Sequence, residues 1–549
     1  MLIHLRTVLV ECLAPGRLTL AAVVGVLALF AGCSVGPDYV RPPTAAPTAY
    51  KENAGWKVAQ PRDELPRGKW WELYNDPQLN ALVEQVDISN QNIAAAEANF
   101  RQALALIRVA RAAYFPTVTG GTSWSRFRNS ANLGGGSRSA SVGGAPGVSG
   151  GSASGGGFGA LGGNTISNLL LTSNASWELD IWGQVRRSVE ASRASAQASA
   201  ATLEGVRLSA QATLAQSYFQ LRALDEQKRL LDDIALAFQK ILDRTRNRYA
   251  SGVASRNDLA LAETQLKNTQ AQAIDLGVQR AQLEHAIATL LGKPASVFSI
   301  PKVPVNLSIP PIPAGVPSEL LERRPDIAAA ERNMAAANAQ VGVAIAAYYP
   351  TVTLSASGGF QASDVAKWFL WPSRFWSLGA AAAQTIFQGG ALVAQTDAAR
   401  AAYDSTVAAY RQTVLTGFQE VEDNLAALRI LEEEAKVQDE AVKAARLSVT
   451  LSTNQYQAGT ISTLDLLVVV TNARNNERTA VTILGNRMSA SALLIKALGG
   501  GWKSSDLPSV LHQPPNSTAS HYASDRRGFP EHSACLNPAG GSAGGSSTR

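Results

Sequence analysis

The sequence IAAAEAN at residues 93–99 returns as IAAAERN at residues 327–333, an offset of 234 residues. The same offset relates AAYFPTVT at residues 112–119 to AAYYPTVT at residues 346–353. A repeat of this length indicates that one half-unit is built twice in the chain. In each copy the helical spacing of apolar residues gives way to alternation after the proline, which predicts a helix followed by a strand.

Long helices are predicted in both copies. Residues 76–113 form an alanine-rich helical region, and residues 185–249 and 391–456 contain no proline. At about 1.5 Å per residue, each of these last two segments is a rod about 100 Å long. Shorter helices are predicted at 255–292 and 463–498. Together with the helices that end near the two prolines, they would stack end to end beside the rods in coiled-coil packing.

Strands are predicted where the helices stop. Apolar and polar residues alternate from Leu169 to Ile181 and again from Val352 to Phe360. Segments of about ten residues with this pattern are typical of transmembrane β-barrel strands, although a half-buried strand of a soluble sheet has the same period. Hairpins at 117–182 and 351–387 would give four strands, too few to close a barrel. Because open edges are excluded in lipid, several chains must pool their strands, and three chains would supply twelve.

Residues 1–32 have the features of a secretory signal peptide, with a short apolar run that ends in small residues before Cys33. This ending resembles the bacterial lipobox, so Cys33 is the predicted lipidation site. An ordinary cleaved signal followed by a chance cysteine is the alternative. Ser34 favours transfer to the outer membrane. The proline-rich residues 33–67 are expected to form an extended tether without a core of its own.

Composition excludes several functions. The net charge of +6 is interspersed with acids, which argues against nucleic-acid binding. After the N-terminus there is no apolar run long enough for a transmembrane helix. The chain has no HExxH motif, paired-cysteine zinc spacing, phosphate-binding loop or nucleophile elbow. We therefore expect no enzymatic activity, no metal and no cofactor other than a covalent lipid on Cys33.

The predicted fold is mixed, an all-α coiled-coil barrel joined to a transmembrane β-barrel. The first repeat covers residues 68–310 with a tip turn at 250–258, and the second covers 311–502 with a tip turn at 457–465. The glycine-rich residues 132–164 are expected to be a loop, and residues 503–549 a disordered tail.

A series of local motifs between residues 33 and 502 resembles the TolC-like outer-membrane efflux channels, in their NodT-type lipoprotein branch. The motifs are GPDYxRP at 36–42, WW at 70–71, DPxL at 76–79, PSxLLxRRPDI at 317–327, IFQGG at 386–390, FxEVE at 418–422 and ALGGGW at 497–502. The resemblance implies a homotrimer with a 12-stranded barrel in outer-membrane lipid above a periplasmic helical tube. It also implies docking to a periplasmic adaptor and an inner-membrane pump, so that the chain is a passive exit duct for small toxic compounds. Protein or peptide secretion by the same fold, and a structural coiled-coil lipoprotein without a pore, are the alternatives.

The two predicted tip turns share one pattern, a Tyr, then Gly three residues later, then Asp-Leu six residues after the glycine. The tip-turn glycines Gly252 and Gly459 have a backbone reason to be there. By resemblance, these turns close the tube at its periplasmic end. Leu464 and Asp465 would narrow the pore, and Tyr456 would bond to Asp258 to hold it shut. The alternative for the two aspartates is an ordinary place on an exposed turn.

Overall fold

The computed structural model describes most of the two repeats. The described residues are 35–42, 50–51, 69–128, 165–302, 309–310, 320–503 and 505. The predicted signal peptide 1–32, the lipidation site Cys33, most of the 33–67 tether, all of the glycine-rich loop 132–164 and most of the 503–549 tail lie outside them.

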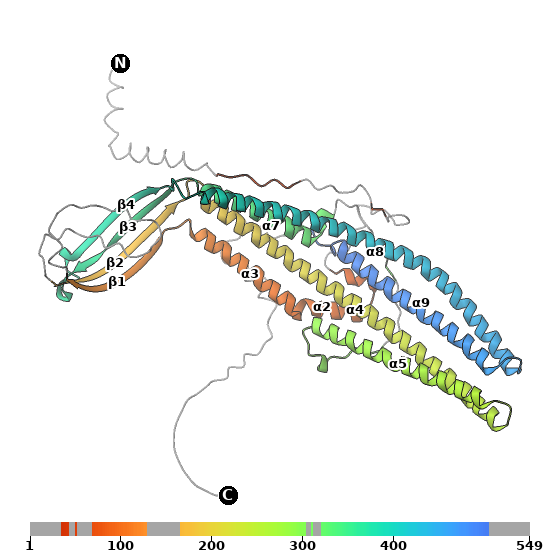
Figure 1. The fold of residues 1–549 in the computed structure, drawn as a ribbon. Coiled ribbons are helices and arrows are strands. Elements are labelled where there is room, and N and C mark those ends of the chain that lie inside the picture. Colours follow the sequence, from red (N-terminus) through yellow and green to blue (C-terminus); the bar gives the residue numbers. More distant parts are fainter. Residues whose placement is uncertain are drawn as a thin grey trace, which may run out of the picture. The chain divides into compact units, whose positions relative to one another are not determined.

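Long helices and one sheet make up the described chain (Figure 1). The helices of the first half are α2 (Pro77–Ser89), α3 (Gln91–Ala112), α4 (Gln184–Ala250) and α5 (Arg256–Leu290). Those of the second half are α6 (Leu320–Arg323), α7 (Pro325–Ala346), α8 (Ala391–Gln457) and α9 (Thr463–Ala497). The strands are β1 (Thr117–Arg128), β2 (Thr165–Leu179), β3 (Thr351–Ala362) and β4 (Arg374–Ala383).

Corresponding helices of the two halves have equal lengths. The rods α4 and α8 have 67 residues each, α5 and α9 have 35, and α3 and α7 have 22. The two predicted rods are therefore confirmed, at about 100 Å each. In each half the shorter helices pack along the rods, α3 and α5 against α4, and α7 and α9 against α8.

The shorter helices meet end to end, as expected, and a polar side chain joins each pair. Asn90 caps the start of α3 and donates to the Leu290 carbonyl at the end of α5 (2.8 Å). At the equivalent position, 234 residues later, Arg324 precedes α7 and donates to the Ala497 carbonyl at the end of α9 (3.0 Å). Both satisfy carbonyls that a helix end leaves without a partner.

The predicted helical region over 76–113 is confirmed, and it is divided into α2 and α3 at Asn90. This residue has extended backbone angles, and its side chain accepts from the amides of Asn92 and Ile93. Asparagine is common at N-cap positions because its side-chain oxygen accepts from backbone amides that have no acceptor within the helix. The break separates α2 from α3 and lets the end of α5 reach Asn90.

The sheet has the order β1-β2-β3-β4, with every neighbouring pair antiparallel. Its register places Trp124 opposite Leu169, Leu171 opposite Phe360, and Ala356 opposite Leu378. Paired residues share a face, so most of the large apolar residues lie on one side of the sheet, although Phe127, Leu170 and Phe375 lie on the other. The β2–β3 pairing joins the two halves, and β1 and β4 are the edges.

The predicted hairpin 351–387 extends too far, because β4 ends at Ala383. Ala383 pairs with Thr351, and the residue before Thr351 is Pro350, which has no N–H for a further ladder bond. The side chain of Gln384 donates instead to the carbonyl of Tyr348 (3.2 Å). Across the described helices, none is both long and apolar enough to cross a membrane.

Candidate functional site

Two tight turns join the paired helices, α4 to α5 and α8 to α9. Gly252 and Gly459 have φ angles of 75° and 76°, in the left-handed region. In the first turn the amides of Gly252 and Val253 donate to the carbonyls of Tyr249 and Arg248. This is a glycine C-cap that ends the rod, so the predicted tip glycines have a backbone role.

Replacing Gly252 with alanine should loosen the first turn, because a Cβ in the left-handed region costs about 1–2 kcal/mol. We expect trypsin to cleave at Arg248 and Arg256 roughly five- to thirtyfold faster. Gly277, in the middle of α5, lacks the positive φ and has open space around a built Cβ. The matched Gly277→Ala variant should therefore resist cleavage at least as well as the wild type, and equal rates in both variants would contradict this role for Gly252.

Both predicted gate aspartates act as helix caps. Asp258 accepts from the Ser255 amide (3.0 Å) and hydroxyl (2.9 Å), and the Ser255 hydroxyl in turn accepts from the Asp258 amide. Asp465 and Ser462 repeat this capping box at the start of α9. The hydrogen bonds from serine lower the pKa of each carboxyl below its usual value.

The expected bond between Tyr456 and Asp258 is not formed within this chain, and the Asp258 carboxylate accepts from Ser255 instead. Tyr456 is 5% exposed and belongs to an apolar cluster with Leu466 and Leu467. Its hydroxyl accepts from the Thr463 hydroxyl (3.4 Å).

Arg248 at the end of α4 provides the cross-helix contact to Tyr456. Its guanidinium lies 5.5 Å from the centre of the Tyr456 ring, within the range of a cation–π contact. Burial alone would raise the pKa of the Tyr456 hydroxyl, but hydrogen bonds from Thr463, Thr245 and Arg248 bring it below its usual value. The charge of Arg248 also contributes to the lowered pKa of Asp258. Arg248 therefore interacts with both Tyr456 and Asp258, the two residues predicted to hold the tip closed.

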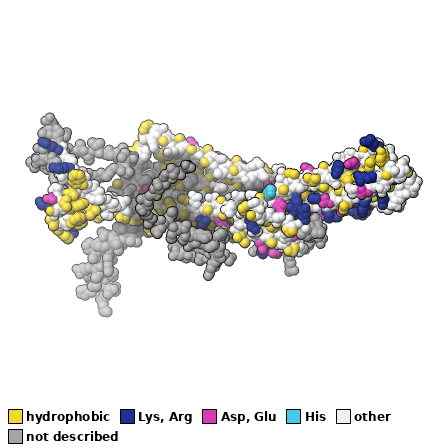
Figure 2. All heavy atoms as spheres, turned by 90° about the horizontal axis from the view of Figure 1, so that it is seen from below, with side chains coloured by type: hydrophobic (Ala, Val, Ile, Leu, Met, Phe, Trp, Pro, Cys, Tyr) yellow, Lys and Arg dark blue, Asp and Glu magenta, His cyan; other side chains and the backbone are white. Residues whose placement is uncertain are grey.

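Leu464 lies in the first turn of α9 with 48% of its surface exposed, and Val468 one turn later is 50% exposed. Exposed apolar residues at this spacing share one face of the helix. Figure 2 shows many charged side chains on the half of the helices that ends at these turns.

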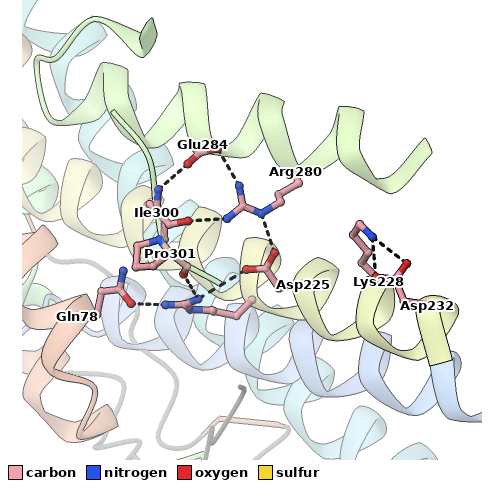
Figure 3. A network of polar contacts seen from close by, with 9 residues as sticks. Gln78, Asp225, Lys228, Asp232, Arg280, Glu284, Ile300 and Pro301 are labelled. Atoms are coloured by element: carbon pink, nitrogen blue, oxygen red, sulfur yellow. Dashed lines mark hydrogen bonds and ion pairs between the residues drawn. The ribbon is translucent and has the colours of Figure 1, made fainter. Parts of the chain in front are cut away.

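A buried polar network lies midway along α4 and was not predicted from the sequence (Figure 3). Asp225 receives the Arg280 guanidinium at 2.7 Å and lies 3.6 Å from that of Arg222. The two arginines also donate to the carbonyls of Ile300 and Pro301. The network thus fastens the segment that follows α5 to the rod. In the sequence, the pattern that could have indicated this network is an arginine followed by an acidic residue three or four positions later.

The N-terminal segment runs along the helices, where the GPDYxRP motif supplies its contacts. The Val35 amide donates to the Trp182 carbonyl (3.1 Å), and Tyr39 donates to Glu331. The buried Arg187 binds the Asp38 carboxylate (2.8 Å) and the Gly36 carbonyl (3.2 Å). The described residues of this segment are therefore held against the helices by these hydrogen bonds and by the ion pair between Arg187 and Asp38.

Removing the guanidinium with Arg187→Met should release this segment. Charge-assisted hydrogen bonds are each worth about 1.5–3 kcal/mol, so amide hydrogen exchange over residues 35–41 should speed up by about tenfold. Arg186→Met is the control, because that neighbouring side chain is exposed. Unchanged exchange in Arg187→Met would show that backbone contacts alone hold the segment.

No cluster of three or more potential metal ligands occurs among the described residues.

The paired rods, the tight turns and the sheet with one apolar face define a TolC-like outer-membrane channel protein.

Comparisons with known proteins agree with this class. A model of the outer membrane efflux protein family matches residues 82–293 and 316–500, more than half of the chain. The chain therefore belongs to the outer membrane efflux protein family. It functions as the outer-membrane channel of an efflux pump.

Curated relatives are similar over most of their length. The pyoverdine export outer membrane protein OpmQ of Pseudomonas putida is 32% identical over 464 residues, 84% of this chain and 94% of that protein. The toluene efflux pump outer membrane protein TtgC of Pseudomonas putida is 28% identical over 480 residues, 86% of this chain and 94% of that protein.

Solved structures show the same fold. The outer-membrane channel OprN is 29% identical with a TM-score of 0.75, over 86% of this chain and 100% of that one. The Neisseria gonorrhoeae MtrE outer membrane channel, in its open state, is 27% identical with a TM-score of 0.71, over 86% of this chain and 99% of that one.

Proposed function

We propose that three copies of this chain form a passive exit duct, with a twelve-stranded barrel in the outer membrane and the helices as a periplasmic tube. The observation that carries this proposal is the four-stranded sheet, with one apolar face and unpaired edges at β1 and β4. In lipid every backbone polar group needs a partner, so β4 of one copy would pair with β1 of the next until the ring closes. The tube would dock on a periplasmic adaptor and an inner-membrane pump, which supply energy and cargo choice.

The cargo of this duct would be small toxic compounds. Relatives are named for efflux of toluene and antibiotics and for export of pyoverdine, all small molecules. A conduit of this kind performs no catalysis and needs no cofactor. The lipid proposed on Cys33 would anchor the chain to the same membrane, because Val35, two residues later, is bonded to Trp182 close to the end of β2.

The gate at the tip would rest on Tyr456, Leu464 and the two capping aspartates, with Arg248 as an additional member. Tyr456 and Arg248 link α8 to α4, so the two helix pairs can separate only when this contact breaks. Leu464 is exposed in the single chain and would meet its symmetry copies on the channel axis. The aspartate carboxylates would form a ring that repels anions and binds cations.

The test is reconstitution of the full-length, purified protein in planar lipid bilayers, with its mass measured in detergent. We expect a trimer and discrete conductance steps. A stable monomer, or a trimer without conductance, would overturn the proposal. A second assay measures efflux of a fluorescent dye from a strain that lacks this chain, before and after the chain is reintroduced. Restored dye efflux supports small-molecule cargo, whereas a secretion defect with normal dye efflux would favour protein export.

A further inference from the structure

The two edge strands of the sheet carry the same arrangement at the end away from the helices. On β1, Trp124 is followed by Arg126 and Arg128 at two-residue spacing. On β4, Trp376 has Arg374 two residues further toward the same end of the sheet. Because successive residues of a strand point to opposite faces, each tryptophan shares its face with the arginines beyond it.

The register shows that this face is the apolar one on both strands. Trp124 is opposite Leu169, and Arg126 is opposite Ser167, the next position on that face. Trp376 is opposite Gly358, and Arg374 is opposite Phe360. Trp124 and Trp376 are 67% and 78% exposed. Figure 2 shows hydrophobic side chains gathered over the sheet, with basic side chains near its outer end.

Charge is distributed unevenly along the sheet. Among the described residues of the strands and the β3–β4 connection, all the cations lie at the end away from the helices: Arg126, Arg128, Lys367 and Arg374. The acids at the helix end are Glu178 and, just after β2, Asp180. The outer end has one acid, Asp364, whose carboxylate caps the Ala366 amide. The outer end is therefore basic on the face that carries Trp124, Leu169, Phe360 and Trp376.

The length of the strands places this end at a membrane boundary. Transmembrane strands of about 9–11 residues span the hydrocarbon when tilted, and β3 and β4 have 12 and 10 residues. Tryptophan prefers the interface of a bilayer, and arginine beyond it meets the headgroups. The β3–β4 connection continues this belt with Phe369 and Trp371, which are 63% and 76% exposed, and the Arg374 guanidinium lies over the Trp371 ring.

We propose that Arg126 and Arg128 of one copy, with Arg374 of the next, bind the phosphate groups of an outer-leaflet lipid at each seam between subunits. This inference rests on the proposed ring, in which the edges β1 and β4 of neighbouring copies are joined. Closing the ring brings the arginines of the two edges together on the lipid-facing side. Guanidinium groups bind phosphate oxygens through paired, charge-assisted hydrogen bonds, and the tryptophans flank the upper acyl chains. The site is incomplete in a single chain.

Native mass spectrometry of the full-length channel with added lipid A, a diphosphorylated lipid, tests the site. We expect one tightly held lipid per subunit. The variant with Arg126→Gln, Arg128→Gln and Arg374→Gln should bind it at least about tenfold more weakly, since several charge-assisted bonds are lost. The control variant carries Arg101→Gln, Arg108→Gln and Arg411→Gln, which remove the same charge from exposed positions on α3 and α8, and it should bind like the wild type.

Three results would overturn the proposal. The first is equal lipid binding by the two triple variants. The second is that the wild type binds dephosphorylated lipid A as tightly as lipid A. The third is displacement of the lipid by millimolar inorganic phosphate alone, which would indicate an anion site. Conductance separates this inference from the proposed channel. If the first triple variant conducts like the wild type yet binds lipid normally, only the lipid site is wrong. If the wild type neither conducts nor assembles, the channel proposal itself fails.

Discussion

Arg248→Ala combined with Tyr456→Phe should raise single-channel conductance in planar bilayers more than any other tip substitution considered. The double variant removes the cation–π contact between Arg248 and the Tyr456 ring and the hydrogen bond from Thr463 to the Tyr456 hydroxyl. Together these are worth about 1–3 kcal/mol per subunit. If they hold the closed state, the open-to-closed ratio should rise by about tenfold or more. The measurement is the distribution of conductance steps at fixed salt.

Arg246→Ala is the matched control. Arg246 is two residues from Arg248 on the same helix, but its side chain is 60% exposed and lies 3.7 Å from Asp243. Exposed ion pairs contribute little to stability, so the conductance of the Arg246→Ala channel should equal that of the wild type. Asp258→Ala should act mainly by removing the cap of α5, with a smaller effect on conductance. A double variant that conducts like the wild type would remove Arg248 and Tyr456 from the gate.

Asp225→Ala should cause the largest loss of stability among the substitutions considered. Its carboxylate is 5% exposed and lies between Arg222 and Arg280, which are 4% and 13% exposed. Removing it leaves the buried Arg222 guanidinium without a carboxylate and Arg280 with Glu284 alone, and breaking a buried pair in this way typically costs about 3–5 kcal/mol. The thermal unfolding midpoint of the purified channel in detergent should fall by several degrees.

Asp232→Ala provides the comparison within the same helix (Figure 3). Asp232 pairs with Lys228 at 2.7 Å, but its side chain is 54% exposed. Such a surface pair contributes about 0–1 kcal/mol, so the midpoint should barely move. If both variants melt at the same temperature, the network does not stabilise the middle of the rod.

The architecture was predictable because it depends on periodicity and repetition. An unbroken helical pattern without proline fixed the two rods to within a residue or two, and strict alternation gave the apolar face of β2 and β3. Two details were not predicted. The helix break at Asn90 comes from local capping, because its side chain accepts from the amides of Asn92 and Ile93. The end of β4 at Ala383 depends on pairing with Thr351, which is distant in sequence.

The candidate site was only partly predictable. The glycine and aspartate spacing located both tip turns, since left-handed glycines and capping boxes are encoded within a few residues. The partner of Tyr456 was not local. Asp258 is bonded to Ser255, three residues away, and the cation facing Tyr456 comes from the end of another helix. No short-range pattern in the sequence marks Arg248 among the several arginines near it.

The sequence by itself therefore determined the repeat, the rods, the strands and the position of both turns, because each depends on backbone preference and apolar period over short distances. Only the tertiary structure decided which residues meet across helices and strands. It brought Arg248 to Tyr456, placed Asp225 between two arginines, and aligned Arg126, Arg128 and Arg374 on the apolar face of the sheet. These contacts depend on rotation about the helix axes and on strand register, which are set by packing of the whole chain rather than by neighbouring residues.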